Sequence, residues 1–263
     1  LHYMSQAEFT NPIIIADGDK DSKIKDLINK KDFQNLNINY LQFDDQKVSD
    51  YYYKMQQSLK HVQTKYIMMC DNDDLVLKNG VIDVLNFLNS EKSFISAGSM
   101  IVNFDINSRS NSTYGNNFCI RSVYKTYRIS EPENNFEYQI MKTFKEFQPN
   151  YYNIFELNSY KITIDEIKEI NFSDMFVPEF YIQLRILTLG KQMKLTSGVQ
   201  LLRQLGTSTT NAEHFSKRLI KTDMSLDIRK LAKFLALHIV EKYPEYNQKN
   251  IEEKILDNFS NYL

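Results

Sequence analysis

The stretch YIMMCDNDDL at residues 66–75 decides the predicted fold, because an apolar run leads directly into a group of carboxylates. Residues 66–70 are apolar on both faces, which is typical of a central parallel strand that helices cover on both sides. Asp71, Asp73 and Asp74 follow at the carboxyl end of that strand, where open α/β sheets bind their ligands. The stretch therefore predicts a buried strand that ends in a polar site.

A second run of this kind lies upstream, at residues 12–16 (PIIIA), and stops at Asp17-Gly18-Asp19. Short apolar runs that end in turn residues indicate buried strands. Strand and helix patterns alternate around the two runs. The spacing predicts helices over 21–31, over 52–62 and from 79 onward, and strands over 38–43 and 94–104. This alternation predicts a doubly wound α/β sheet with right-handed crossovers.

The second half of the chain is predicted to be richer in helices. We expect a loop at 107–117, a helix near 135–147, strands at 151–157 and 199–204, and helices at 178–190, 223–242 and 248–261. Pro178 and Gly190 mark the two ends of the best-defined helix. The predicted organisation is an α/β domain at 1–211 and a C-terminal helical extension at 212–263.

Charge and cysteine content exclude several classes of protein. The 263 residues include 32 Lys and Arg against 33 Asp and Glu, so the chain lacks the basic surplus of a general nucleic-acid binder. Cys70 and Cys119 lie far apart, which favours neither a zinc site nor a disulfide framework and indicates a reducing compartment. No apolar run reaches the ~20 residues of a transmembrane helix. We expect a cytoplasmic protein, either free or peripheral at the inner face of the membrane.

The carboxylates at residues 71–74 favour a divalent cation. Their mutual repulsion raises their pKa values unless a cation or hydrogen-bond donors offset it. Mg²⁺ or Mn²⁺ held by one or two carboxylates keeps open positions for diphosphate oxygens, and it stabilises the charge on a leaving nucleoside diphosphate. The structural alternative is that these residues cap the helix that starts near Asn79.

The turn at residues 17–21 (DGDKD) does not fit a calcium-binding EF-hand loop. Such a loop needs Gly at its sixth position and Glu at its twelfth, and the chain has Ser22 and Ile28 there. Two interpretations of Asp17 are left: a carboxylate beside a nucleobase or ribose, and a plain polar turn.

Residues 13–21 (IIIADGDKD) and 66–75 together resemble the two signatures of family 2 glycosyltransferases with the GT-A fold. Residues 51–75, the pair Tyr151-Tyr152 and residues 178–190 are similar to a bacterial subgroup of these enzymes, so the resemblance extends over most of 1–210. It implies a GT-A-like mixed sheet flanked by helices. It also implies an inverting, Mn²⁺- or Mg²⁺-dependent transfer of a sugar from a nucleotide-sugar, expected to be a UDP-sugar, to a saccharide or lipid-linked acceptor.

The resemblance assigns roles on the donor side. Asp17 would face the nucleobase, and Asp19 would stand beside it in the nucleotide-sugar site. Asp71 would meet the ribose or the metal, and Asp73 would bind the metal. His214 would complete the metal shell, as a histidine does in some relatives.

Two cations would bring positive charge to the diphosphate. Lys54 stands near the position where the family has Arg-Asn and this chain has Met55-Gln56, and its structural alternative is an exposed helix lysine. Arg203 is able to meet a phosphate with two N–H groups, and its structural alternative is a surface ion pair.

On the acceptor side, the resemblance places the catalytic base just ahead of the Leu-Arg pair that ends at Arg185. Counting back gives Glu179, with Asp174 as the second choice. A carboxylate there takes the proton of the acceptor hydroxyl while the sugar carbon is attacked from the opposite face. Its structural alternative is a plain helix N-terminus, which favours acidic residues. Tyr151 and Tyr152 would stack on an acceptor sugar, with one of them turned to the core by strand alternation.

Two departures from the family pattern leave other functions open. The family's opening strand and its loop over the nucleotide are absent, because residues 1–6 (LHYMSQ) resemble the end of the helix that follows it. From this we expect that the chain begins late or binds a donor poorly. In addition, Ala16-Asp17 stands in place of the usual Asp-Asp. The alternatives are a catalytically silent interaction domain of a larger protein and a nucleotidyltransferase, and the expected protein partners are further domains or a second copy.

Overall fold

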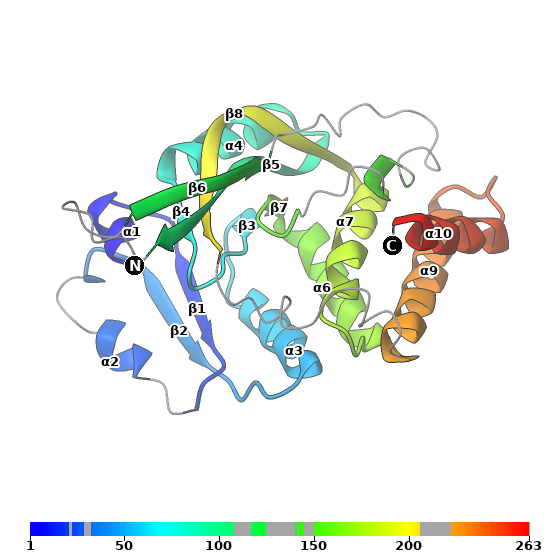
Figure 1. Cartoon of the computed structure of the whole chain (residues 1–263), viewed down its shortest axis with the longest axis horizontal. Coiled ribbons are helices and arrows are strands. Elements are labelled where there is room, and N and C mark those ends of the chain that lie inside the picture. Colours follow the sequence, from blue (N-terminus) through cyan, green and yellow to red (C-terminus); the bar gives the residue numbers. More distant parts are fainter. Residues whose placement is uncertain are drawn as a thin grey trace.

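The computed structural model describes residues 1–20, 23–28, 33–107, 117–124, 140, 142–144, 150–205 and 222–262. Figure 1 shows the strands gathered on one side of the molecule and the later helices on the other. The strands are β1 (Ile13–Asp17), β2 (Ile38–Gln42), β3 (Tyr66–Met68), β4 (Leu75–Val76), β5 (Phe94–Asn107), β6 (Asn117–Tyr124), β7 (Ile154–Glu156) and β8 (Lys191–Gln204). The helices are α1 (His2–Gln6), α2 (Ile24–Ile28), α3 (Val48–Leu59), α4 (Lys78–Ser90), α6 (Leu157–Ile170), α7 (Val177–Leu189), α9 (Thr222–Lys242) and α10 (Gln248–Tyr262). Most of the predicted loop at 107–117 and of the predicted helix near 135–147 lies outside the described residues.

The strands form two sheets. β1 and β2 pair in parallel, with Ile13 opposite Ile38. The other strands form a six-stranded mixed sheet with the order β3-β7-β5-β8-β4, and β6 pairs with β5. Helices flank the strands, so the predicted α/β class with a mixed sheet is confirmed.

The prediction that residues 66–70 form a central parallel strand is wrong. β3 lies at one end of the six-stranded order, is half-buried and pairs antiparallel with β7. Its side chains nevertheless meet apolar partners on both faces. Ile67 packs against one hydrophobic core, and Tyr66 and Met68 pack against another. Residues 66–68 are therefore apolar on both faces because β3 is an end strand that lies between two hydrophobic cores.

β5 and β8 run parallel in the middle of the larger sheet. The sequence predicts a strand only at 199–204, whereas β8 begins at Lys191. Its first half is polar, yet Gln192 and Lys194 are buried, because Gln192 accepts a hydrogen bond from Asn150 and Lys194 donates one to Asn153. Buried polar side chains that satisfy one another interrupt the apolar pattern from which strands are predicted.

No helix is predicted over residues 157–170, where the structure has α6. The buried residues Tyr160, Ile164 and Ile167 follow helical spacing. The start of α6 has a weaker sequence signal than the start of α7. Its N-cap residue is Glu156, whose carboxylate accepts a hydrogen bond from the backbone N–H of Ser159 at 2.8 Å. Glu is uncommon at a helix N-cap, so this start is hard to recognise from the sequence.

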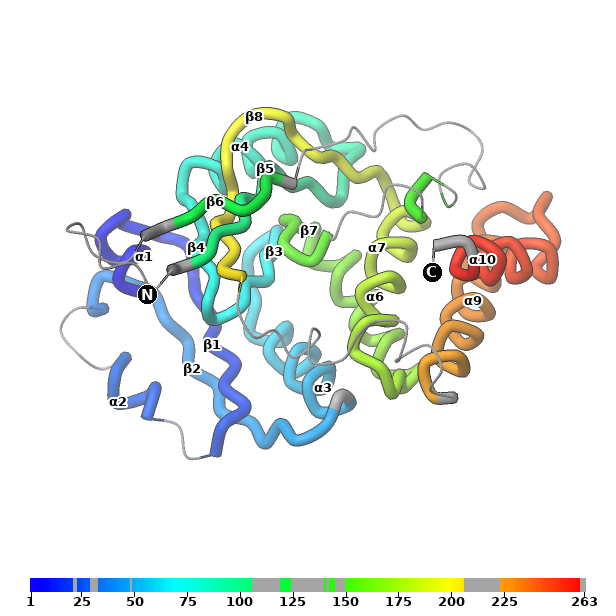
Figure 2. Tube along the Cα trace, in the orientation of Figure 1, coloured from blue at the N-terminus to red at the C-terminus, as the bar shows by residue number. Residues whose placement is uncertain are grey.

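One hydrophobic core joins α6, α7, α9 and α10. Figure 2 shows α7 between the strands and α9. Arg185 of α7 donates two hydrogen bonds to Glu166 of α6, at 2.7 and 2.8 Å, and His238 of α9 lies 3.3 Å from the same carboxylate. The helices after residue 222 thus pack directly against the helix that carries Glu179.

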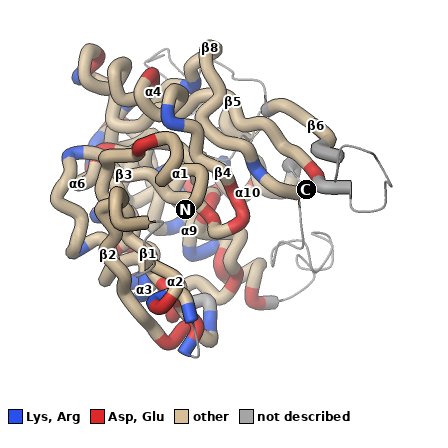
Figure 3. Tube along the Cα trace, turned by 90° about the vertical axis from the view of Figure 1, so that its left-hand side faces the viewer, with Lys and Arg blue, Asp and Glu red and all other residues tan. Residues whose placement is uncertain are grey.

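No helix in the described ranges has the length and apolar character required to cross a membrane. Acidic and basic positions are mixed over the face shown in Figure 3, and one acidic stretch lies beside β4. The loop at residues 71–74 enters β4 at this place, so the predicted site lies where that stretch is seen.

Candidate active site

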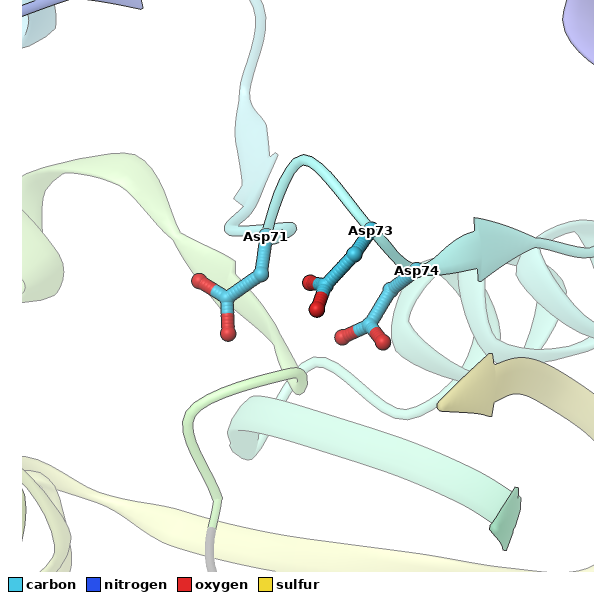
Figure 4. A group of neighbouring side chains, drawn as sticks. All are labelled: Asp71, Asp73 and Asp74. Atoms are coloured by element: carbon cyan, nitrogen blue, oxygen red, sulfur yellow. The ribbon is translucent and has the colours of Figure 1, made fainter. Parts of the chain in front are cut away.

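Residues 71–74, in the loop between β3 and β4, are called the acidic loop below. Asp71, Asp73 and Asp74 offer carboxylate oxygens that lie within 4.8 Å of one another. Figure 4 shows the three side chains on the same side of the loop. Neighbouring carboxylates repel one another, and hard divalent cations prefer oxygen ligands. The acidic loop is therefore suited to hold a hard divalent cation.

Asp74 adds a carboxylate to the two ligands that the sequence assigns to the metal. Its Oδ1 accepts a hydrogen bond from the backbone N–H of Gln204 at 3.0 Å. Its Oδ2 is buried and has no hydrogen-bond partner in the described part of the chain. Burial raises the pKa of this carboxyl group, the nearby donors Tyr152 and Gln204 oppose the rise, and the charges of Asp71 and Asp73 add to it. A buried oxygen without a donor is unfavourable, and a bound cation would relieve it, so these residues fit a metal.

The alternative that the acidic loop caps α4 is wrong. The N-cap residue of α4 is Leu77, and no side chain caps this helix. The backbone N–H of Leu77 instead donates to the carbonyl oxygen of Gln200 on β8, at 2.8 Å. The carboxylates of the loop are thus left for contacts other than the helix start.

Tyr151 and Tyr152 both reach Asp71. The hydroxyl of Tyr151 donates to Oδ1 of Asp71 at 3.1 Å, and the hydroxyl of Tyr152 donates to Oδ2 at 2.8 Å. As expected, one of the two tyrosines faces the core: Tyr152 is buried in a hydrophobic core and Tyr151 is half-buried at its edge. Strand alternation is not the reason, because both stand ahead of β7, which begins at Ile154. Their hydroxyls therefore converge on one carboxylate.

Arg203 lies next to this group, at the end of β8. Its guanidinium carbon is 5.9 Å from the centre of the Tyr152 ring, a cation–π distance. The following residue, Gln204, binds Asp74 through its backbone N–H. The structure therefore places the predicted phosphate-binding arginine beside the acidic loop.

Asp17 ends β1 and is buried, with 8 % of its surface exposed. Its Oδ2 accepts from the hydroxyl of Tyr40 at 2.9 Å, and its Oδ1 accepts from the backbone N–H of Asp19 at 3.1 Å. Asp19 itself is exposed. A Cβ atom on Gly18 would approach the side chain of Asp45 to 2.6 Å, so the turn requires glycine at this position.

Lys54 connects the turn after β1 to the tyrosines. It forms an ion pair with Asp45, and both side chains are largely buried. Its ammonium group also lies 5.2 Å from the centre of the Tyr51 ring. The hydroxyl of Tyr51 is 2.8 Å from that of Tyr151. The interpretation of Lys54 as an exposed helix lysine is therefore wrong, although its contact with a diphosphate stays a prediction.

Glu179 lies in the first turn of α7, as predicted. It lines a small pocket, too narrow to hold a water molecule, together with Asn150, Tyr151 and Ile182. Since Tyr151 also binds Asp71, this pocket adjoins the acidic loop. Asp174 stabilises the turn just before α7, because its Oδ1 accepts from the backbone N–H of Phe176 at 2.7 Å. Of the two candidate bases, Glu179 is the one that lines the pocket.

The predicted metal ligand His214 lies outside the described residues. Other residues of the site were not predicted from the sequence. Asn150 could have been suspected because it precedes the pair Tyr151-Tyr152. A role of Asp74 at the metal could have been suspected because it follows Asp73 directly. Tyr51 lies within the matched run 51–75 but gives no signal, because a tyrosine in an amphipathic helix usually belongs to the core.

The mixed sheet flanked by helices, with an acidic loop after β3, defines a GT-A-like α/β protein. Comparison with solved structures agrees. The structure of S. aureus TarS 1–349 matches with a TM-score of 0.55 and 13% identity, covering 98% of this chain and 63% of that one. The same TarS chain in complex with UDP-GlcNAc gives 0.57 and 12%, covering 97% and 63%. A further TarS structure gives 0.53 and 12%, covering 97% and 38%.

This chain thus spans less than two thirds of the TarS chains that it matches. At identities of 12% to 13%, the likeness shows the fold alone. No protein-family model and no curated protein sequence matches the chain.

Proposed function

We propose that this chain is a glycosyltransferase that moves a sugar from a nucleotide-sugar to a hydroxyl group of a saccharide or lipid-linked acceptor, with inversion. The observation that carries the proposal is the group of carboxylate oxygens within 4.8 Å of one another on the acidic loop of a GT-A-like fold. The similar structure of TarS with UDP-GlcNAc makes UDP-sugars the first donors to test.

The donor side of the proposed site consists of the acidic loop and the residues beside it. Asp71, Asp73 and Asp74 would hold Mn²⁺ or Mg²⁺, which when bound supplies positive charge to the departing diphosphate. Arg203 would add a second positive charge from the end of β8. Asp17, fixed by Tyr40, would face the nucleobase from the turn after β1. These contacts give charge stabilisation where the leaving group becomes more negative.

Glu179 supplies the base on the acceptor side. In the proposed reaction, its carboxylate takes the proton of the acceptor hydroxyl while that oxygen forms a bond to the anomeric carbon. The bond from this carbon to the diphosphate oxygen breaks at the same time, and its electron pair leaves with the nucleoside diphosphate. Attack from the face opposite the leaving group inverts the configuration. Glu179 and Tyr151 line one small pocket and Tyr151 binds Asp71, which supports a position of the base beside the acidic loop.

Thermal unfolding with UDP, GDP, CDP and their sugars, each with and without Mn²⁺, tests the proposal. We expect at least one diphosphate to raise the melting temperature only when the metal is present, because a ligand that binds the native state stabilises it. The same donor should then lose its sugar to water or to an acceptor. If no diphosphate raises the melting temperature in a metal-dependent way, the proposed glycosyltransferase activity is refuted.

The two other functions predict different results in this experiment. A silent interaction domain would release no sugar from a nucleotide-sugar, whether or not it binds a nucleoside diphosphate. A nucleotidyltransferase would be stabilised by nucleoside triphosphates and a sugar phosphate instead. The acceptor, the oligomeric state and the cytoplasmic location stay predictions from the sequence.

A further inference from the structure

The exposed carboxylate of Asp71 is bound on both oxygen atoms by tyrosine hydroxyls. An ionised carboxylate only accepts hydrogen bonds, so the hydroxyl protons of Tyr151 and Tyr152 both point toward it. Each oxygen of a carboxylate offers two lone pairs, and these two bonds leave the others for a cation. The tyrosines therefore fix the orientation of Asp71 without blocking it as a ligand.

The direction of the next hydrogen bond follows from counting protons. The hydroxyl oxygens of Tyr51 and Tyr151 are 2.8 Å apart, and either one could be the donor on distance alone. Tyr151 has a single hydroxyl proton, which it already gives to Asp71. Tyr51 must therefore donate to Tyr151. The result is a directed chain of hydrogen bonds from Tyr51 through Tyr151 to Asp71.

Tyr51 is itself held in place by its surroundings on α3. Lys54 lies over its ring at 5.2 Å, and Tyr52 meets the ring edge-on with centres 5.2 Å apart. Burial raises the pKa of Tyr51 to about 12, so its hydroxyl keeps its proton under ordinary conditions. Each donor in such a chain polarises the next one and strengthens its bond. A rigid, protonated Tyr51 thus stabilises the bond from Tyr151 to Asp71.

We propose that Tyr51 is a positioning residue for the metal site, which acts through Tyr151 to hold the carboxylate of Asp71 in its binding orientation. This inference rests on the proposed function, since it takes Asp71 as a ligand of Mn²⁺ or Mg²⁺. Without Tyr51, the hydroxyl of Tyr151 loses its donor and the exposed Asp71 gains rotational freedom. Ordering Asp71 then costs part of the binding free energy of the cation.

Titration calorimetry of Mn²⁺ in the presence of UDP tests this role without any turnover. For Tyr51→Phe, which keeps the ring, we expect Mn²⁺ affinity to fall about threefold to tenfold, the effect of one hydrogen bond. For Tyr151→Phe, the direct partner of the ligand, we expect a fall of about tenfold to a hundredfold. In the Tyr151→Phe background, Tyr51→Phe should change the affinity less than about twofold, because the chain is already broken.

The control is Tyr53→Phe, at an exposed position of the same helix, which should bind Mn²⁺ as the wild type does. Wild-type Mn²⁺ affinity in a folded Tyr51→Phe variant would overturn the inference and leave the proposed function intact. An equal, independent loss from Tyr51→Phe in the Tyr151→Phe background would overturn it too. A wild-type chain that binds neither Mn²⁺ nor UDP would refute both the inference and the proposed function. If Tyr51→Phe does not fold, Tyr151→Phe decides alone, and unchanged Mn²⁺ affinity there overturns the inference.

Discussion

The carboxylate of Asp227 accepts a hydrogen bond of 2.6 Å from the backbone N–H of Ser173. The same oxygen accepts one from the N–H of Asp174 at 2.8 Å, and the other oxygen accepts one from Lys230 at 3.0 Å. Asp227 lies on α9 and is fully buried, whereas Ser173 lies in the segment that leads into α7. α9 therefore fixes the segment that precedes the helix that carries Glu179.

Asp227→Ala should destabilise the fold by about 3 kcal/mol, because it leaves two backbone N–H groups without their charged acceptor. Urea unfolding measures this difference. Asp223→Ala, at an exposed position in the first turn of the same helix, is the matched control and should change the stability by less than about 0.5 kcal/mol. Equal stabilities of the two variants would show that the buried carboxylate does not anchor the segment before α7.

The sequence predicts most elements of this fold because their polar and apolar residues alternate at a regular spacing. α7 is found from Pro178 and Gly190, and β1 from its short apolar run. The first half of β8 escapes prediction, since Gln192 and Lys194 look like surface residues and are satisfied by partners far away in sequence. The position of β3 in the sheet could not be predicted for another reason. An end strand between two cores is apolar on both faces, and so is a central strand, so their sequence patterns are the same.

The candidate site is predictable only where a motif singles out its residues. The carboxylates of the acidic loop follow directly from a strand, and their chemistry is independent of the rest of the fold. The bonds of Tyr51 and Asp227 depend on the packing of α3 and α9 against distant segments, which no local pattern reports. The division at residue 211 stays a prediction.

Lys194 is predicted to make the stability of the fold rise with pH. Its side chain is fully buried, and desolvation lowers its pKa from 10.5 to about 8. Between these values the unfolded chain holds a proton that the folded chain has lost, so raising the pH favours the folded state. Relative to Lys194→Met, the wild-type free energy of unfolding should rise from pH 8 to pH 10, by up to about 1.4 kcal/mol per pH unit.

Urea unfolding of the two proteins at several pH values measures this slope. Lys233→Met, at an exposed position of α9, is the control for the loss of one positive charge. Parallel pH profiles of the wild type and Lys194→Met would mean that the buried amine keeps its proton on folding.

Asp73→Asn should weaken the metal-dependent part of diphosphate binding and leave the fold intact. Asp73 is exposed, and its carboxylate belongs to the group within 4.8 Å, so its charge is needed for the cation more than for packing. We expect the Mn²⁺ concentration for half-maximal stabilisation by UDP to rise at least about tenfold, the usual scale for changes at a metal site. Asp257→Asn, at an exposed position of α10, is the control. An unchanged metal requirement would remove Asp73 from the ligands.

Glu179→Gln should retain donor binding and lose sugar transfer. Gln keeps the size and polarity of the side chain in the pocket with Asn150 and Tyr151, but it cannot take a proton from the acceptor. The expected fall in kcat is about 10²- to 10⁴-fold, the contribution of a general base, with the UDP-induced shift in melting temperature unchanged. The matched variant is Asp174→Asn, since that carboxylate accepts from the backbone N–H of Phe176. If Asp174→Asn loses transfer and Glu179→Gln keeps it, the base is Asp174 and the pocket beside Tyr151 serves another purpose.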